Sequence, residues 1–251
     1  LMTFVILGFL IFNACALLQA PSSVEEQAPA DTLENLDDLT GNVPDQSDLG
    51  ICANPFQPVN ESIRWKYQLS SSGEIQTFDV FLQDVSPESF TKIVEFPENS
   101  VESSWICGDE GLVSSQYSSI TTAGLDNFGF NTLDVKGISI PSADLWEVGY
   151  TWQNEYITEI NFAVGENSVT GQGNIKLDYT ITDIESVSVP TGIYDNAYKV
   201  NTVITISVDL AGSTNTISTG SNDWYVENIG LVRSESSSQD FPYILELIAM
   251  E

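Results

Sequence analysis

The sequence predicts an all-β protein: a curved antiparallel sheet, arranged as a half-barrel, an open barrel or a sandwich, and built from two related β-units. Three observations after residue 50 lead to this prediction. Apolar side chains recur at every second position in several runs, Ser, Thr, Asn and Gly fill the intervals between them, and no segment carries a helical apolar stripe of eleven or more residues. One face of such a sheet is buried and the other is wet.

Four runs show the alternation of a strand most clearly, at 63–69, 156–164, 174–181 and 200–210. The side chains expected on the buried face are Ile63, Trp65, Tyr67, Leu69, Tyr156, Ile160, Phe162, Val164, Ile175, Leu177, Tyr179, Ile181, Val200, Ile204, Ile206, Val208 and Leu210. The stretch PSADLWEVG, 141–149, has room for one helical turn.

One string occurs twice. WICGDEGLV at 105–113 and WYVENIGLV at 224–232 both begin with Trp, have Gly six positions later and end in Leu-Val. In each half an earlier Trp follows three residues after a small residue. We interpret the strings as the same corner of two units, about 52–125 and 139–251, where the Gly supplies a positive φ and Leu-Val begins the return strand. Chance similarity is the alternative, because only four positions match.

The first eighteen residues, LMTFVILGFLIFNACALL, carry no charge. Such a segment is typical of an export signal or a short membrane span. Residues 12–15, Phe-Asn-Ala-Cys, resemble the lipobox of bacterial lipoproteins. We predict a signal segment at 1–15 with lipidation at Cys15, and ordinary cleavage or an uncleaved anchor are the alternatives. All three place the remainder outside the cytoplasm, in the cell envelope, and the first and third attach it to a membrane.

An acidic stretch separates this segment from the strands. Residues 16–50 hold eight acidic residues, no basic residue and no aromatic residue. Such a composition buries too little apolar surface to offset the entropy of ordering, so we predict a disordered tether at 16–50 and a β domain at 51–251.

The chain of 251 residues has 36 acidic residues, 7 basic residues, a net charge of -29 and no His. This charge repels nucleic acid, so we expect no nucleic-acid partner. It fits a saline habitat or simply an acidic extracellular protein. Without His the chain lacks the Ser-His-Asp and Cys-His nucleophile systems, His-ligated zinc and imidazole general bases.

Two cysteines remain if Cys15 is acylated or removed. Cys52 and Cys107 then form an even pair in an oxidising compartment. We predict a disulfide between them, with two buried free thiols as the alternative.

Three stretches resemble uncharacterised bacterial surface lipoproteins. CANPFQPVNESIRWKY at 52–67 is similar to the opening of their mature domains, VPTGIYDNAYKV at 189–200 to a recurrent hairpin, and WYVENIGLVRSE at 224–235 to a closing strand pair. The resemblance implies a curved antiparallel sheet, similar to the half-barrels of lipoprotein carriers.

Catalytic patterns find little support. SFTK at 89–92 matches Ser-x-x-Lys, but the companion Ser-Asp-Asn and Lys-Thr-Gly elements are missing from the sequence. GQG at 171–173 lacks a third glycine and is interpreted as an interval between strands, so it does not indicate a phosphate loop. A pair of carboxylates could hydrolyse glycosides, but 36 acids make some close pair inevitable.

Calcium is the cofactor that the acidic composition allows, because clustered oxygen ligands suit a hard cation. The candidate ligands lie in GDEG and DNFGFN; they are Asp109, Glu110, Asp126, Asn127 and Asn131. Neither loop has a known calcium-loop spacing, and solvated turns are the alternative. Among the aromatic residues, Trp146 is the one expected to be exposed and able to contact a ligand.

Together these observations predict a non-catalytic, envelope-anchored β lipoprotein that binds an apolar small molecule or a surface protein on its sheet face. A structural or adhesive surface component without a cavity and a carboxylate-dependent hydrolase are the alternatives.

Overall fold

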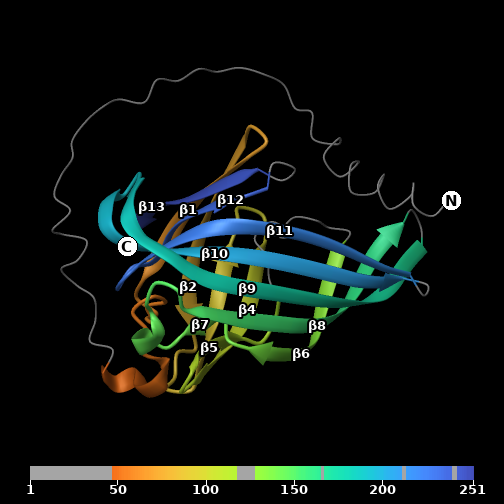
Figure 1. Cartoon of the computed structure of the whole chain (residues 1–251), viewed down its shortest axis with the longest axis horizontal. Coiled ribbons are helices and arrows are strands. Elements are labelled where there is room, and N and C mark those ends of the chain that lie inside the picture. The colour runs from red at the N-terminus through yellow and green to blue at the C-terminus, as the bar shows by residue number, and fades with distance from the viewer. Residues whose placement is uncertain (1–46, 118–127, 165–166, 211–212, 239–241) are drawn as a thin grey trace. The chain divides into compact units, whose positions relative to one another are not determined.

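The residues that the structure describes form one open antiparallel sheet of thirteen strands (Figure 1). The computed structural model describes residues 47–117, 128–164, 167–210, 213–238 and 242–251. The strands are β1 (Arg64–Ser71), β2 (Glu74–Gln83), β3 (Ser89–Glu95), β4 (Ser100–Gly108), β5 (Gly111–Ser114), β6 (Phe128–Gly137), β7 (Ile140–Pro141), β8 (Thr151–Val164), β9 (Asn167–Val189), β10 (Gly192–Leu210), β11 (Ser213–Val226), β12 (Gly230–Ser236) and β13 (Tyr243–Met250). Their order is β6-β8-β9-β10-β11-β12-β13-β1-β2-β3-β4-β5-β7. The prediction of an antiparallel, all-β fold is therefore confirmed, in the form of an open sheet.

The sheet contains two meanders of five strands each, β1 to β5 and β8 to β12, joined through β13. Each meander has a Trp on its first strand, Trp65 or Trp152, and another on its fourth strand, Trp105 or Trp224. The two repeated strings thus occupy the same place in two meanders of the same topology.

Both strings turn at their glycine. Gly111 pairs with Gly108 across the β4–β5 turn, and Gly230 pairs with Val226 across the β11–β12 turn. The φ angles are 142° at Gly111 and 91° at Gly230, in the region that favours glycine. A Cβ on Gly111 would lie 2.2 Å from the carbonyl oxygen of Ile140, so this position also lacks room for a side chain. The predicted turn at each glycine is confirmed in both meanders.

The second meander has much longer strands than the first, and GQG lies inside one of them. β9 runs for 23 residues and passes through Gly171 to Gly173, so the prediction that GQG separates two strands is wrong. A Cβ on Gly173 would lie 2.5 Å from the side chain of Ile160 and 2.6 Å from that of Thr158. The glycine therefore allows close packing on the neighbouring strand and makes no turn.

Most buried apolar side chains of both meanders form one hydrophobic cluster, while Tyr156, Ile160 and Ile175 are buried outside it. The segment before β1 joins distant parts of the sheet across this core. The Asn54 side-chain amide donates to the carbonyl oxygen of Pro141 in β7, and the Asn228 amide between β11 and β12 donates to the carbonyl oxygen of Pro55. Because β7 ends the sheet and β11–β12 lies near its middle, the sheet must curve, as the crossing of β8–β11 over β2, β4 and β5 illustrates (Figure 1).

Helical structure is sparse in the described residues. Two 3₁₀ segments are present, η2 (Ser47–Cys52) and η3 (Ala143–Leu145), and η3 is the single turn expected within 141–149. None of the helices described here is long and apolar enough to cross a membrane. The predicted signal segment with Cys15 lies outside the described residues, as does the tether up to residue 46.

Candidate functional site

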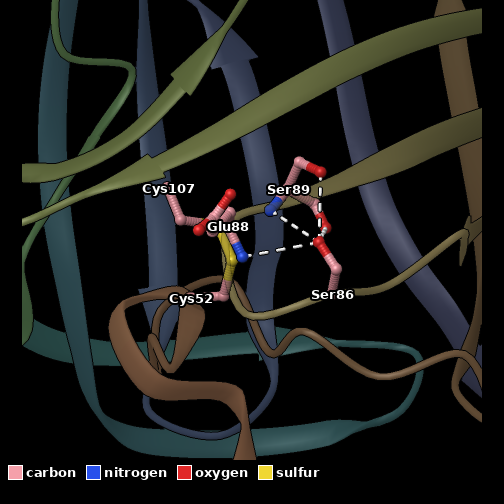
Figure 2. Close-up of a disulfide and its surroundings, with 5 residues drawn as sticks. All are labelled: Cys52, Ser86, Glu88, Ser89 and Cys107. Carbon is pink, nitrogen blue, oxygen red and sulfur yellow. Dashed lines mark hydrogen bonds between the residues drawn. A yellow bond between two sulfur atoms is a disulfide. The ribbon is translucent and has the colours of Figure 1, made fainter.

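The disulfide fixes the segment before β1 against β4. Cys52 at the end of η2 is bonded to Cys107 in β4, and both are buried (Figure 2). The turn before β3 lies beside this bond: the Glu88 carbonyl accepts from the Cys107 amide at 2.8 Å, and the Ser86 hydroxyl accepts from the Ser89 amide at 3.0 Å. The disulfide thus holds the segment that covers one end of the core.

We call the sheet face that carries the hydrophobic cluster the inner face. At one end it is filled by aromatic side chains, and Trp146 is at their centre. Its ring stacks on Phe56 at 3.8 Å between centroids and contacts the edges of Tyr198 at 5.6 Å and Tyr225 at 5.4 Å. Its relative exposure is 7%, so the expectation that Trp146 is exposed is wrong. The stacking partner lies 90 positions earlier in the chain, which local sequence does not reveal.

Towards the other end, the inner face loses its cover across β8 to β11. One cross-strand row runs from Tyr156 through Ile175 and Ile206 to Ile217. Tyr156 is 5% exposed and Ile175 is fully buried, whereas Ile206 is partly buried and Ile217 is 52% exposed. We define the open end as the aliphatic side chains of β10 and β11 on this face: Ile204, Ile206, Val208 and Ile217. It is an apolar surface that the described residues leave in contact with solvent.

A buried polar cluster lies where β5, near one end of the sheet, approaches β8, near the other end. Asn154 is fully buried, and its Nδ2 donates to the Ser139 hydroxyl at 2.6 Å and the Tyr156 hydroxyl at 3.1 Å, but its Oδ1 has no hydrogen-bond partner among the described residues. Burial raises the pKa of Tyr156, and hydrogen bonds with Ser139, Ser114 and Asn154 oppose this rise. The ring of Tyr117 packs on Tyr156 at 5.5 Å. Residues from β5 and β8 therefore contact each other here.

Lys92 is the basic residue on the inner face. It pairs with Leu82 on β2 and with Ser103 on β4, both buried. Its ammonium lies over the ring of Trp105, 5.5 Å from the centroid. Burial lowers the pKa of Lys92 to about 8. Alternation along β3 places Ser89 on the opposite face, so the Ser-x-x-Lys pair cannot act as a catalytic unit.

A buried carboxyl, Asp223, joins three strands. It accepts hydrogen bonds from Thr202 on β10 at 2.6 Å, from Ser221 on β11 at 3.0 Å and from Ser234 on β12. Burial raises the pKa of Asp223, and these hydroxyls oppose the rise. Because each carboxyl oxygen has a hydroxyl donor, we interpret Asp223 as a structural residue.

The two closing Trp residues have different surroundings. Trp105 faces the core beside Lys92, whereas Trp224 contacts Lys199 at 5.1 Å and Arg233 at 5.6 Å. The indole N–H of Trp224 donates to Glu185 at 2.8 Å. This bond and that from Lys199 lower the pKa of Glu185. The cations that contact Trp224 are therefore already paired with carboxylates, Lys199 with Glu185 and Arg233 with Glu246.

The calcium candidates are not brought together. Asp109 and Glu110 are exposed in the β4–β5 turn, and Asn131 is exposed on β6. Asp126 and Asn127 lie outside the described residues. Within the part of the chain that the structure describes, no three His, Cys, Asp or Glu residues converge as a metal site would require. A calcium site stays a prediction.

Sequence reasoning missed Lys92 and Asn154 as inner-face groups, although the signal was present. Lys92 lies between Phe90 and Val94 at the apolar positions of its strand, and Asn154 lies between Trp152 and Tyr156 in the same way. A polar residue at a buried position of a period-two pattern therefore marks a group on the core face.

The comparisons with known proteins give a family match and similar solved structures. Residues 96–240, more than half of the chain, match the model of the family described as DUF3108-like. The chain is similar to a crystal structure of a candidate lipoprotein from Parabacteroides distasonis, with a TM-score of 0.52 and 16% identity over 79% of this chain and 99% of that one. It is also similar to a candidate exported protein with a YmcC-like fold from Bacteroides fragilis, with a TM-score of 0.49 and 13% identity over 79% of this chain and 100% of that one. No curated protein matches the chain.

Proposed function

The chain belongs to the DUF3108-like family, and on this premise we propose that it is an extracytoplasmic, membrane-anchored lipoprotein that binds an apolar ligand on its inner face without catalysing a reaction. The observation that carries the proposal is the open end. An aliphatic row that starts at fully buried Ile175 continues to Ile217 with half of that side chain exposed. Contiguous apolar surface beside a packed core is the usual form of a site for an apolar ligand or partner.

The location is supported by three further observations. The uncharged segment at 1–18 ends near Cys15, and the Cys52–Cys107 disulfide suits an oxidising compartment. The similar protein of Parabacteroides distasonis is itself described as a candidate lipoprotein.

Retained ligand is the first expected result. Native mass spectrometry of protein expressed in a bacterial host should show an apolar molecule bound, and a neutral fluorescent naphthylamine probe should bind to the emptied protein. Ile217→Ser should lower the affinity for the probe about fivefold. The substitution removes roughly 1 kcal/mol of apolar contact from a side chain that is already half exposed.

Ile193 provides the matched control. It is also a strand Ile, 58% exposed, but lies on the outer face beside Ser188. Ile193→Ser should leave probe affinity unchanged. Equal affinities for the Ile217→Ser and Ile193→Ser proteins, together with an empty wild-type protein, would contradict binding at the open end.

A structural or adhesive role is the second candidate, and a specific observation favours it. The end of the inner face around Trp146 is filled by the protein's own aromatic side chains. Native mass spectrometry also distinguishes a small molecule from a surface protein as the partner of the open end. If the partner is a surface protein, the purified chain should carry no small molecule.

Anchoring is tested separately. Cys15→Ala should move the protein from the membrane fraction to the soluble extracytoplasmic fraction, because the acylated thiol is lost. Metabolic labelling with a radioactive fatty acid should mark wild type and not the variant. Labelling that persists in Cys15→Ala would contradict lipidation at this residue.

A further inference from the structure

Lys92 places an ammonium group on an apolar part of the inner face. Its neighbours on the same face of β3 are Phe90, which is 2% exposed, and Val94, which is partly buried. Across the ladders it faces Leu82, 1% exposed, and Ser103, 4% exposed. Charged side chains are rarely found among buried apolar side chains, so packing alone does not explain Lys92 at this position.

The charge of Lys92 is not compensated. Four other basic residues have a carboxylate oxygen within 3.0 Å: Arg64, Lys176, Lys199 and Arg233. Among the described residues, no carboxylate forms an ion pair with Lys92, and its ammonium group donates no hydrogen bond, although the chain has 36 acids. The face of Trp105 is its stabilising contact. With a pKa of about 8, most molecules still carry this charge at pH 7. A partly buried, unpaired cation lowers stability, so its presence points to a role in binding.

Lys92 and the open end lie on the same face of the sheet and are linked by buried side chains. Trp105, under the ammonium, pairs across β4–β5 with Ser114. The Ser114 amide donates to the Ser139 hydroxyl, which also accepts from Asn154 on β8. Asn154 donates to the hydroxyl of Tyr156, which begins the row that ends at Ile217. The inner face therefore carries both an apolar surface and an ammonium group, the two features that an anionic amphiphile would contact.

We propose that Lys92 binds the anionic headgroup of an amphiphile whose acyl chain lies on the inner face, an inference that rests on the proposed function. An ammonium offers three N–H donors and a full charge to carboxylate or phosphate oxygens. Phe90 and Leu82 supply an apolar setting in which such charge-assisted bonds are strong. The headgroup would supply the counter-charge that Lys92 otherwise lacks.

The test uses the full chain and three ligands with the same sixteen-carbon tail: palmitate, hexadecyl phosphate and hexadecanol. Displacement of the neutral naphthylamine probe at pH 7 gives each affinity. Wild type should prefer at least one anion to the alcohol by about tenfold or more, as expected for charge-assisted hydrogen bonds. Lys92→Met should abolish this preference and leave hexadecanol within about twofold of wild type. Lys92→Arg should keep the preference, and Lys66→Met, at an exposed lysine on β1, should have no effect.

Lys92→Met should also raise the thermal midpoint, because it removes a partly buried, unpaired charge, so loss of anion binding will not reflect misfolding. The anion that binds more tightly identifies the headgroup as a carboxylate or a phosphate. Equal affinities of wild type for alcohol and anions, or a preference that survives in Lys92→Met, would overturn the inference while the proposed function stands. If the probe itself does not bind and none of the three ligands binds, the proposed function is overturned.

Discussion

Replacing both Cys52 and Cys107 by Ala is expected to lower the free energy of unfolding by about 4 kcal/mol, because the disulfide closes a loop of 55 residues and restricts the unfolded chain. Both residues are buried, so replacing them by Ala hardly changes the solvent-exposed surface of the folded protein. Urea unfolding of wild type and the double variant, followed by far-ultraviolet circular dichroism, measures the difference.

Reduced wild type is the control. It keeps both sulfur atoms in the core and should lose nearly the same stability as the double variant, since the loss arises from the freed unfolded chain. Hydrogen bonds from Asn54 to Pro141 and from Asn228 to Pro55 still hold the segment before β1, so both proteins should remain folded in water. A difference below about 1 kcal/mol would show that the loop-closure argument fails for this chain.

The sheet could be predicted from sequence because the alternation of apolar and polar residues that indicates a strand is a local pattern. In β1 and β9, apolar residues two positions apart reach the core, as Trp65, Tyr67, Ile175 and Ile181 do. The paired corners could be predicted too, since a Gly before Leu-Val indicates a turn, and Gly111 makes such a turn in the structure.

What failed depended on contacts between distant segments. Gly173 was interpreted as part of an interval between strands because glycine is common in turns, but it lies within β9 so that Ile160 and Thr158 can pack against it. Trp146 is expected to be exposed because it lies in the loop before the second unit, yet Phe56 covers it. The uncompensated charge of Lys92 could not be predicted, since it depends on which of 36 acids come close.

Trp146→Ala is expected to lower the free energy of unfolding by about 4 kcal/mol, the usual cost of deleting a large buried aromatic side chain. The variant loses the stacking on Phe56 and the edge contacts with Tyr198 and Tyr225. The carbonyl oxygen of Pro141, which accepts from the indole N–H at 3.3 Å, keeps its bond from Asn54, so the loss comes mainly from packing.

Two variants separate packing from ligand contact at this position. Trp146→Phe keeps a ring over Phe56 and should lose less stability than Trp146→Ala, while Val148→Ala, at a neighbouring side chain that is 55% exposed, should change stability by less than about 0.5 kcal/mol. Urea unfolding of all three gives the order. If Trp146→Ala instead costs less than about 1 kcal/mol and weakens the naphthylamine probe, the ring belongs to a binding surface, because a side chain that only contacts a ligand contributes little to the stability of the empty protein.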